Sequence, residues 1–580
     1  MTPHLASSEA RGVLDAATAR EKTTLLHAFF HWVATKPDAV FLTQPFPDGT
    51  VVDFTWAQTG DAVRRLAAYL AGLGLPPKSN VGLLAKNSAH WFVADLAVWA
   101  AGHVSVPCYP TLSTENLAYV LTHAGIELLF VGKLDAPAWE TMRAALPVGL
   151  RTVNLPFGPL QNAAQFDEIV ASTPPLETIP EPRADDLATI MYTSGSTGRP
   201  KGVAHTFASM LPGTRAFGEL FPYAAQDRFL SYLPLAHAAE RALVETPALY
   251  NGSHVYFANS LETFAQDLKR ARPTIFFSVP RLWTKFYAGI NAKLPAQKQR
   301  VLFRIPFVSR IVKRKILAEL GLDRVRVALT GSAPLSESIV RFYRELGLEL
   351  YEGYGMSENF AASHINYPGD VRPGYVGRPI PGVECRIAPS GEIEVKSPGQ
   401  MLEYYKLPEL TAETMCSDGF FRTGDRGEID QFGRLKITGR VKDLFKTSKG
   451  KYVAPVPIEQ RLGAQTAVEA VCVMGLGRSQ PFGLLMLAAD AAATAKSDSD
   501  ARTRLERDLE TLREGVNEAL EAHERLAFLV IVDDAWTIES GLLTPTMKIR
   551  RDELEARYLS RAERWESQGR SIIWEIQSTT

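Results

Sequence analysis

The sequence predicts an α/β protein with a large N-terminal domain and a small C-terminal domain. Three observations support this prediction: strand-like apolar runs alternate with helical patterns from about residue 50 to 350, short turn-rich segments follow from about residue 380, and a new pattern of strands with one charged helix begins after Arg440. The first alternation is typical of layers built on mostly parallel strands. A chain of 580 residues is also long enough for more than one domain.

The elements of the N-terminal domain follow from their apolar patterns. Buried strands are expected where short apolar runs occur, and amphipathic helices where the apolar residues repeat every three or four positions. The predicted strands are 80–85, 126–131, 187–192, 274–279, 326–330 and 348–351, and the predicted helices are 89–101 and 336–346.

The later part of the chain has a different texture. The turn residues at 390–391, 417–419 and 431–433 predict antiparallel hairpins. In the C-terminal domain we expect strands at 468–474, 484–489 and 528–532, a charged helix at 500–524, and a solvated loop and helix entry over the acidic, alanine-rich segment 488–500. A boundary near 439–442 divides the chain into residues 1–439 and 440–580.

Charge and cysteine content narrow the choice of partners. Lys+Arg number 63 and Asp+Glu 64, so no overall basic excess favours nucleic acid. The four cysteines are scattered and form no metal-binding spacing, which indicates reduced thiols in a cytoplasmic protein. The long apolar stretch at 91–106 is interrupted and falls short of the ~18 residues of a membrane span. The sequence therefore predicts no spanning helix and no signal peptide, but leaves peripheral membrane contact and the oligomeric state open.

The most informative stretch is 192–202, Tyr-Thr-Ser-Gly-Ser-Thr-Gly-Arg-Pro-Lys-Gly, directly after a predicted strand. Its glycines allow backbone N–H groups to turn inward as an anion nest, while hydroxyls and a lysine add further donors. A polyphosphate is the natural guest. The stretch is not a Walker A loop, because Pro200 interrupts the required order of glycine and lysine.

Two clusters offer groups for a nucleotide and a metal ion. In residues 351–358, Tyr354 provides a flat face for a base, Ser357 a hydroxyl for a phosphate, and Glu358 a hard oxygen ligand for Mg²⁺. Residues 331–333, Gly-Ser-Ala, follow a predicted strand and are small enough for backbone to approach a flat ring closely.

Three charged positions complete the set. Asp425 follows a tight turn, where a carboxylate can accept hydrogen bonds from a ribose diol or simply close an Asx turn. Arg440 lies at the predicted boundary and can reach a ribose or a phosphate, and Lys442 stands where a hinge would lie. Lys548 follows a loop punctuated by Gly541 and Pro545; by itself such a lysine is usually a solvated surface charge.

Taken together, these ordered motifs resemble those of the acyl-adenylate-forming enzymes, which include acyl-CoA synthetases, luciferases and the adenylation domains of peptide synthetases. The resemblance covers about residues 25–560. Segments 231–241, 443–455 and 543–548 look most like those of long-chain fatty acyl-CoA synthetases. The resemblance implies layered α/β subdomains and a β-barrel-like part in the N-terminal domain, and a mobile C-terminal α+β domain.

The resemblance also implies roles for residues. The loop from Thr193 to Lys201 would hold the β- and γ-phosphates of ATP, Glu358 would help bind Mg²⁺, and Lys548 would bridge the acyl carboxylate and the α-phosphate. His237 would stand near the acyl–phosphate junction, although a buried structural histidine is the simpler reading, and Lys442 would be the hinge. The implied nucleotide-contacting residues are Thr193, Ser194, Gly195, Ser196, Thr197, Gly198, Lys201, Gly331, Ser332, Ala333, Tyr354, Gly355, Met356, Ser357, Asp425 and Arg440.

The resemblance implies a two-step reaction that uses ATP, Mg²⁺ and coenzyme A to convert a carboxylic acid into its CoA thioester. One departure from the family pattern concerns chain length. Ala238 to Arg241 stand where some bacterial long-chain enzymes carry a tryptophan gate. A medium- to long-chain fatty acid is the expected substrate; an aromatic or other bulky acid, a carrier-protein acceptor, and a catalytically silent nucleotide sensor are the alternatives.

Overall fold

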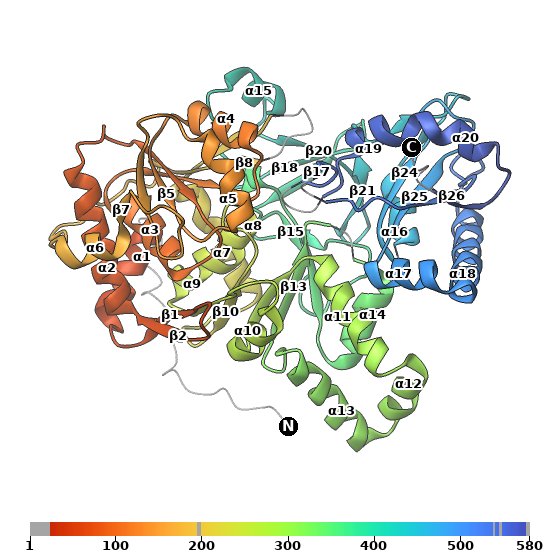
Figure 1. The fold of residues 1–580 in the computed structure, drawn as a ribbon, viewed down its shortest axis with the longest axis horizontal. Coiled ribbons are helices and arrows are strands. Elements are labelled where there is room, and N and C mark those ends of the chain that lie inside the picture. Colours follow the sequence, from red (N-terminus) through yellow and green to blue (C-terminus); the bar gives the residue numbers. More distant parts are fainter. Residues whose placement is uncertain are drawn as a thin grey trace.

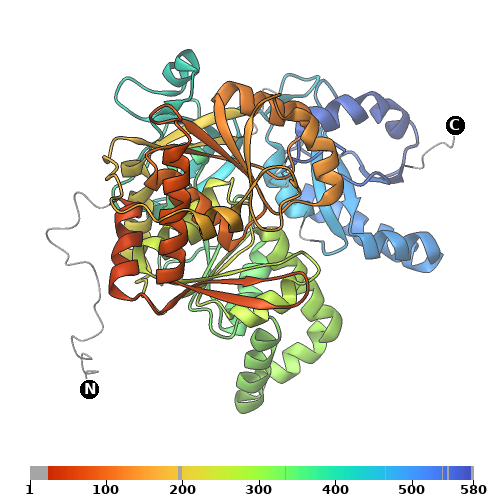
Figure 2. The ribbon, with the colours of Figure 1, turned by 60° about the vertical axis from the view of Figure 1, so that its left-hand side comes forward.

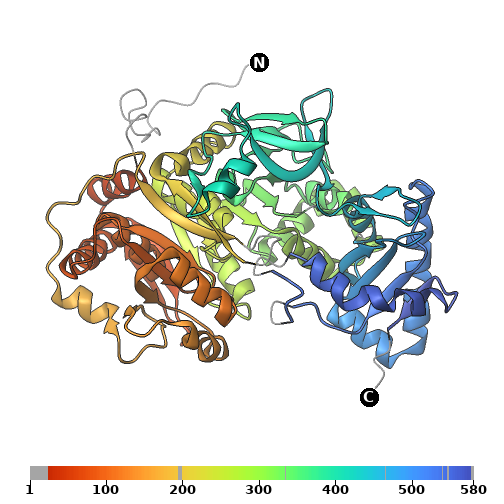
Figure 3. The same ribbon diagram turned by 90° about the horizontal axis from the view of Figure 1, so that it is seen from above.

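The computed structural model describes residues 24–193, 199–333, 335–463, 465–537, 540–544 and 548–575 of the chain. The N-terminal α/β layers and the C-terminal domain lie at opposite ends of the molecule (Figure 1, Figure 3). The predicted α/β class is confirmed, and the elements below are those that position the candidate site.

The largest sheet has eight strands, of which the central ones are parallel. The strands run in the order β19 (Glu403–Tyr404), β9 (Lys201–Thr206), β8 (Leu187–Thr193), β4 (Val104–Cys108), β3 (Asn80–Leu84), β5 (Ile126–Val131), β6 (Arg151–Asn154) and β7 (Ala164–Gln165). All residues of β3 and β4 are buried, as expected of parallel strands covered on both faces. The predicted strands at 80–85, 126–131 and 187–192 are confirmed.

Helix α3 (Ala89–Ala100) shows why this layer is tightly packed. Ser88 caps its first turn by accepting a hydrogen bond from the Trp91 amide. All twelve of its residues are buried, so the long apolar stretch noted at 91–106 consists of most of this core helix, a turn and the start of β4. Among the described residues, no helix is long and apolar enough to cross a membrane.

A four-stranded sheet joins distant parts of the chain. Its order is β10 (Arg228–Ser231), β11 (His254–Phe257), β1 (Val40–Pro45) and β2 (Val51–Thr55). Its core contacts include the stacked rings of Phe41 and Trp56, whose centroids lie 3.8 Å apart. Helix α2 (Trp56–Gly72) begins at that tryptophan, with Thr55 and Gln58 forming a capping box.

A third sheet carries several candidate residues at its strand ends. Strands β12 (Ile275–Ser278), β13 (Val327–Gly331) and β14 (Leu350–Tyr354) are parallel, and β15 (His364–Ile365) and β16 (Arg378–Pro379) are antiparallel additions. Helices α11 (Pro280–Lys293) and α14 (Glu337–Leu346) belong to this layer, and α14 buries one apolar side in its core. These strands and α14 confirm the predictions made for 274–351.

The turn-rich segment forms the antiparallel sheet of β17 (Glu384–Ile387), β18 (Glu392–Lys396), β20 (Phe421–Ile429) and β21 (Leu435–Arg440). The predicted hairpins are therefore confirmed. This sheet occupies the part of the N-terminal domain that was expected to be barrel-like.

The C-terminal domain is built on the sheet of β24 (Val468–Met474), β25 (Phe482–Leu487), β26 (Leu529–Val532) and β27 (Ile572–Trp574). It contains two hydrophobic clusters: one includes Leu542 and Leu543, and the other includes Leu509 of helix α18 (Ser499–Glu518). Segment 488–500 was expected to be a solvated loop and helix entry. The loop part is wrong, because the segment contains the separate helix α17 (Ala489–Ser497). Its many alanines have the strongest intrinsic helix propensity.

Candidate active site

Asp425 and Arg440 face each other on neighbouring strands β20 and β21. Arg440 Nε donates to Asp425 Oδ1 at 3.0 Å, and the Tyr354 hydroxyl donates to Oδ2 at 2.8 Å. The Asp425 side chain is only 13% exposed. Asp425 thus links the end of β14 to the antiparallel sheet, and each of its oxygens keeps a lone pair for a further hydrogen bond.

The turn after β14 is held in a tight conformation. A Cβ on Gly355 would lie 2.4 Å from the carbonyl carbon of Ala361, so only glycine fits there. The Met356 amide donates to Asn359 Oδ1 at 2.9 Å. The next residues, Ser357–Asn359, form a short 3₁₀ helix that carries Ser357 and Glu358.

His205 supports this turn from β9. Its ring nitrogen Nε2 donates to the Ser357 carbonyl oxygen at 2.7 Å. Burial lowers the pKa of His205 to about 4, with a smaller contribution of the same sign from the charge of Arg241. The ring is therefore neutral near pH 7, and the Nε2–H donor is retained.

Glu358 is placed by Tyr404 of β19. The Tyr404 hydroxyl donates to Glu358 Oε1 at 2.7 Å, and Lys201 Nζ lies 5.6 Å from the centre of the Tyr404 ring. Desolvation and the nearby charge of Lys442 lower the pKa of Lys201, while Glu358 and Glu413 oppose that shift. The lysine at the start of β9 and the candidate metal ligand therefore belong to one electrostatic cluster.

Gly331, Ser332 and Ala333 follow β13 directly. A Cβ on Gly331 would lie 2.9 Å from the carbonyl oxygen of Gly353 on β14, so a side chain has no room between these strands. Ser332 adopts a left-handed conformation with φ 69°, and Ser332 and Ala333 are exposed. Backbone is therefore accessible at the carboxyl end of this parallel sheet, where ligands of α/β proteins bind.

His237 caps the short helix α8 (Ala238–Glu240). Its Nδ1 accepts a hydrogen bond from the Ala239 amide at 3.1 Å, so the ring proton of the neutral form is on Nε2. Burial lowers the pKa of His237 to about 4, and the charge of Lys548 adds to this shift. His237 is therefore a neutral donor close to Lys548.

Lys548 reaches this cluster from the C-terminal domain. The Thr544 amide donates to the Lys548 carbonyl oxygen at 2.8 Å, the Lys548 amide donates to Thr544 Oγ1 at 3.0 Å, and Leu543 pairs with Ile549. Desolvation by the surrounding protein, with a contribution from Arg440, lowers the pKa of Lys548, whereas Asp425 and Glu358 oppose the shift. Lys548 as a residue is nevertheless exposed to water, so solvent weakens its interactions with the charges of Arg440, Asp425 and Glu358.

The middle of the predicted phosphate-binding loop is not among the described residues. Ser194, Gly195, Ser196, Thr197 and Gly198 lie outside the described residues. Thr193 and Lys201, on either side of them, are paired across the antiparallel strands β8 and β9. The described strands on either side of the phosphate-binding candidate are thus antiparallel neighbours in an otherwise largely parallel sheet. Lys442 is exposed just after β21, and its hinge role stays a prediction.

Comparison with known proteins identifies the chain. Residues 29–405 match the family model described as AMP-binding enzyme, and residues 442–565 match the one described as AMP-binding enzyme C-terminal domain. The chain belongs to the AMP-binding enzyme family. The recognition made from the sequence motifs is therefore confirmed.

Relatives of this AMP-binding enzyme include fatty acid ligases. It is 30% identical to a long-chain-fatty-acid–CoA ligase from Mycobacterium bovis, over 91% of the chain and 94% of the relative. It is 31% identical to the peroxisomal long chain acyl-CoA synthetase 6 of Arabidopsis thaliana, over 91% of the chain and 84% of the relative. This AMP-binding enzyme is accordingly an AMP-forming acid–thiol ligase that uses ATP, Mg²⁺ and coenzyme A.

Solved structures share the fold of this AMP-binding enzyme. The adenylation domain of a carboxylate reductase from Mycobacterium chelonae aligns with a TM-score of 0.78 at 22% identity, covering 94% of the chain and 91% of that domain. The anthranilate CoA ligase AuaEII, solved with anthranoyl-AMP, aligns with a TM-score of 0.76 at 21% identity, covering 93% and 98%. These likenesses confirm the predicted fold class.

Two residues of the AMP-binding enzyme site were missed by sequence reasoning. Tyr404 orients Glu358, and His205 holds the turn that carries Ser357. No local motif marks either residue. Their proximity depends on strands distant in the chain, since β19 pairs with β9 across about 200 residues. His205 alone had a weak signal, as it lies four residues after Lys201.

The residues present fit the Mg²⁺ that AMP-binding enzymes use. No group of three metal-ligating side chains occurs among the described residues, and Glu358 is a single carboxylate held by one hydrogen bond. Mg²⁺ usually takes only one or two protein carboxylates and completes its shell with substrate phosphates and water. A single carboxylate such as Glu358 is therefore compatible with Mg²⁺ binding, and its role as the ligand stays a prediction.

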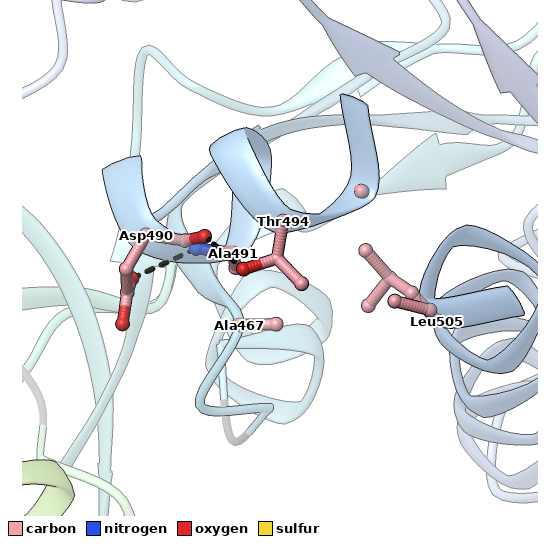
Figure 4. Close-up of a pocket in the computed structure, with 7 residues that line it drawn as sticks. Ala467, Asp490, Ala491, Thr494 and Leu505 are labelled. Carbon is pink, nitrogen blue, oxygen red and sulfur yellow. Dashed lines mark hydrogen bonds between the residues drawn. The ribbon is translucent and has the colours of Figure 1, made fainter. Parts of the chain in front are cut away.

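A shallow pocket elsewhere in the AMP-binding enzyme does not compete with this site. It lies between α17 and α18 in the C-terminal domain and is lined mainly by alanines, with Asp490, Thr494 and Leu505 (Figure 4). The polar contacts drawn there are local helix contacts, from Ala491 N to Asp490 Oδ1 and from Thr494 Oγ1 to Asp490 O. None of the predicted site residues lines it.

Proposed function

We propose that this AMP-binding enzyme activates a medium- to long-chain fatty acid, first as acyl-AMP with release of pyrophosphate and then as acyl-CoA with release of AMP. The observation that supports the adenylation site is the position of Lys548. Its charge lowers the pKa of His237, and the charges of Arg440, Asp425 and Glu358 shift the pKa of Lys548 itself. The acyl class is supported by long-chain relatives at about 30% identity.

In the proposed first step a carboxylate oxygen attacks the α-phosphorus of ATP and the bond to pyrophosphate breaks. Lys548 would neutralise the negative charge that gathers where the acyl carboxylate meets the α-phosphate, and His237 would donate its Nε2–H to an oxygen there. Donors fixed in position before the reaction stabilise such charge without reorganisation. Bound Mg²⁺ would offset phosphate charge beside Glu358.

The nucleotide would lie along the strand ends already described. Asp425 and Arg440 are proposed to hold the ribose, Tyr354 and residues 331–333 to frame adenine, and Ser357 to contact the α-phosphate. The hairpin connection from Thr193 to Lys201 is proposed for the β- and γ-phosphates. Gly355 and Met356 would complete the wall of the nucleotide site.

The second step needs a different arrangement of the domains. We place the boundary between residues 439 and 440, so that the C-terminal domain, residues 440–580, turns about Lys442 and withdraws Lys548 after adenylation. The thiol of CoA then attacks the acyl carbonyl carbon, and AMP leaves. Such domain rotation is an ordinary gating device in enzymes.

Pyrophosphate exchange with a panel of acids tests the acyl class. With ATP and Mg²⁺, octanoate, dodecanoate and palmitate should support exchange well above benzoate, and acyl-CoA should form only when CoA is added. Faster exchange with benzoate would overturn the fatty acid proposal in favour of an aromatic acid ligase. If pyrophosphate exchange occurs without acyl transfer to CoA, but a carrier protein is loaded, the protein is an acyl-AMP ligase. If no acid supports exchange, the alternative of a nucleotide sensor remains.

A fatty acid substrate also bears on where the enzyme works. We propose a cytoplasmic enzyme with reduced thiols that makes peripheral contact with a membrane, the phase in which long-chain acids dissolve. The four cysteines are free. A nucleic acid partner is not part of the proposal, because the chain has a net charge of −1.

A further inference from the structure

Helices α12 (Ala296–Arg304) and α13 (Pro306–Glu319) form a helical hairpin that projects from the N-terminal domain (Figure 1, Figure 2). It follows α11, which starts directly after β12 and carries the chain away from the strand ends of the candidate site. A helix of 14 residues is about 21 Å long. The hairpin therefore plays no part in the site described above.

The hairpin exposes large apolar side chains. Within eleven residues, Val301 is 62% exposed, Ile305 47%, Phe307 86% and Ile311 68%. Isolated apolar residues on a surface are ordinary, but four together on one projecting element indicate an interaction surface.

The same segment is strongly cationic. Residues 293–318 contain no aspartate or glutamate but eight basic residues: Lys293, Lys298, Arg300, Arg304, Arg310, Lys313, Arg314 and Lys315. None of these eight has an ion-pair partner among the described residues. In a chain of net charge −1, this is a local concentration of positive charge.

Apolar and basic side chains share one side of α13. At 100° per residue, Phe307, Arg310, Ile311, Arg314 and Lys315 fall within an arc of about 140°. Each of the five has another of the set three or four residues away, and all five are exposed. Ile316 lies on the opposite side and Leu317 at the edge of this arc, and both pack against a core cluster of the N-terminal domain. The outer side of α13 is thus not needed to hold the helix in place.

We infer that the outer side of the α12–α13 hairpin docks on an anionic lipid surface. An interfacial helix has apolar side chains that enter the boundary between headgroups and acyl chains, flanked by lysines and arginines that attract anionic headgroups. Long basic side chains can bury their stems while their charges stay among the headgroups. The hairpin is a projecting, convex element, and a flat deformable surface accommodates it more readily than a protein partner without a matching groove.

This inference rests on the proposed function, because docking gains its purpose from a substrate that partitions into membranes. A docked enzyme would collect fatty acid at the bilayer surface instead of from dilute solution. The residues concerned are distant from Lys548 and Asp425, so lipid binding and adenylation can be measured separately.

The test is sedimentation of the full chain with vesicles of phosphatidylcholine alone or with 30% phosphatidylglycerol. The variant is F307S/I311S/R310Q/R314Q. The matched control is V148S/L261S/R564Q/R570Q, which changes two exposed apolar residues and two exposed arginines elsewhere. Wild type and control should bind the anionic vesicles and release them in high salt, and the variant should bind at least about tenfold more weakly. Exchange with octanoate in solution should be equal for all three proteins.

Several outcomes would overturn the inference. These are no wild-type binding to anionic vesicles, equal binding by the variant, or a concentration-dependent dimer that the variant disrupts while vesicles remain unbound. Capture of an acidic carrier protein through the same residues, without lipid binding, would also overturn it. Failure of the proposed function is separate, since it would appear as absent exchange with fatty acids while vesicle binding remained measurable.

Discussion

Arg281 and Glu469 form an ion pair that joins the first turn of α11, in the N-terminal domain, to β24 in the C-terminal domain. The arginine side chain is 51% exposed and the glutamate 25%. The pair therefore connects the domains in the arrangement that places Lys548 near Asp425 and Glu358. Because it is partly exposed, its contribution should be at most about 1 kcal/mol.

Breaking this pair should weaken the closed arrangement selectively. We expect R281Q or E469Q to reduce pyrophosphate exchange by up to about fivefold, while attack of CoA on preformed acyl-AMP is unchanged or faster. Single-turnover measurements of the two half-reactions check this. The reversed pair R281E/E469R should recover most of the loss, and equal losses in both half-reactions would contradict a role in domain closure.

Replacing Arg241 should destabilise the fold strongly. Its fully buried guanidinium bonds Asp95 Oδ2 at 2.6 Å and Glu245 Oε2 at 2.7 Å, and lies 5.4 Å from the ring centre of Trp91 and of Trp99. Removing it leaves two buried carboxyl groups without their counter-ion. We expect R241M to lower the free energy of unfolding by about 3–5 kcal/mol.

Urea denaturation of R241M and of the matched control R341M checks this prediction. Arg341 lies on α14 with a side chain 71% exposed and an ion pair to Glu337, so its replacement should change stability by less than about 0.5 kcal/mol. In the triple variant D95N/R241M/E245Q, part of the lost stability should return. Similar small effects of R241M and R341M would show that the buried network is not stabilising.

The buried His205 should make the free energy of unfolding depend on pH. Its folded pKa is about 4, whereas the ordinary value is 6.5. Between these values the unfolded chain binds a proton that the folded protein does not, so the free energy of unfolding falls as pH drops from 6.5 towards 4. The contribution is at most about 3 kcal/mol.

Denaturation midpoints at pH 7 and pH 4.5, compared between wild type and H205Q, measure this contribution. Glutamine retains an amide donor for the Ser357 carbonyl but does not titrate in this range. We expect H205Q to lose less stability between the two pH values than wild type does. H31Q is the control, because His31 lies on helix α1 (Leu25–Thr35) and not in the turn that carries Ser357. An unchanged slope in H205Q would exclude His205 as a source of acid sensitivity.

The sequence predicted elements better than it predicted contacts. Strands β5 and β24 occur at the predicted residues, since continuous apolar runs identify buried strands well. The segment containing Ala489–Ser497 was expected to be a loop and helix entry and not a separate helix, because its sequence shows no apolar periodicity, although alanine favours helix. Residues known from motifs, such as Asp425 and Arg440, were found together. Tyr404 was not predicted, because only the pairing of β19 with β9 brings it to Glu358.

Lys548 provides the sharpest test of the proposed site, because it lies more than 100 residues beyond every other candidate and is carried by a loop of the C-terminal domain. Buried Leu542 and Leu543 anchor the loop that carries it, and its charge lowers the pKa of His237 in the N-terminal domain. If Lys548 stabilises charge only during adenylation, K548A should reduce pyrophosphate exchange by about 10²–10³, corresponding to roughly 3–4 kcal/mol of transition-state stabilisation.

The matching measurement is CoA transfer from preformed acyl-AMP, which K548A should carry out at nearly the wild-type rate. K449A, which removes an exposed lysine elsewhere in the C-terminal domain, should be normal in both assays and thereby exclude a general effect of lost charge. K548R should retain more exchange than K548A, because it restores a cation on the same loop. Equal losses of K548A in both half-reactions would instead mean that Lys548 supports the C-terminal domain and not the chemistry of adenylation.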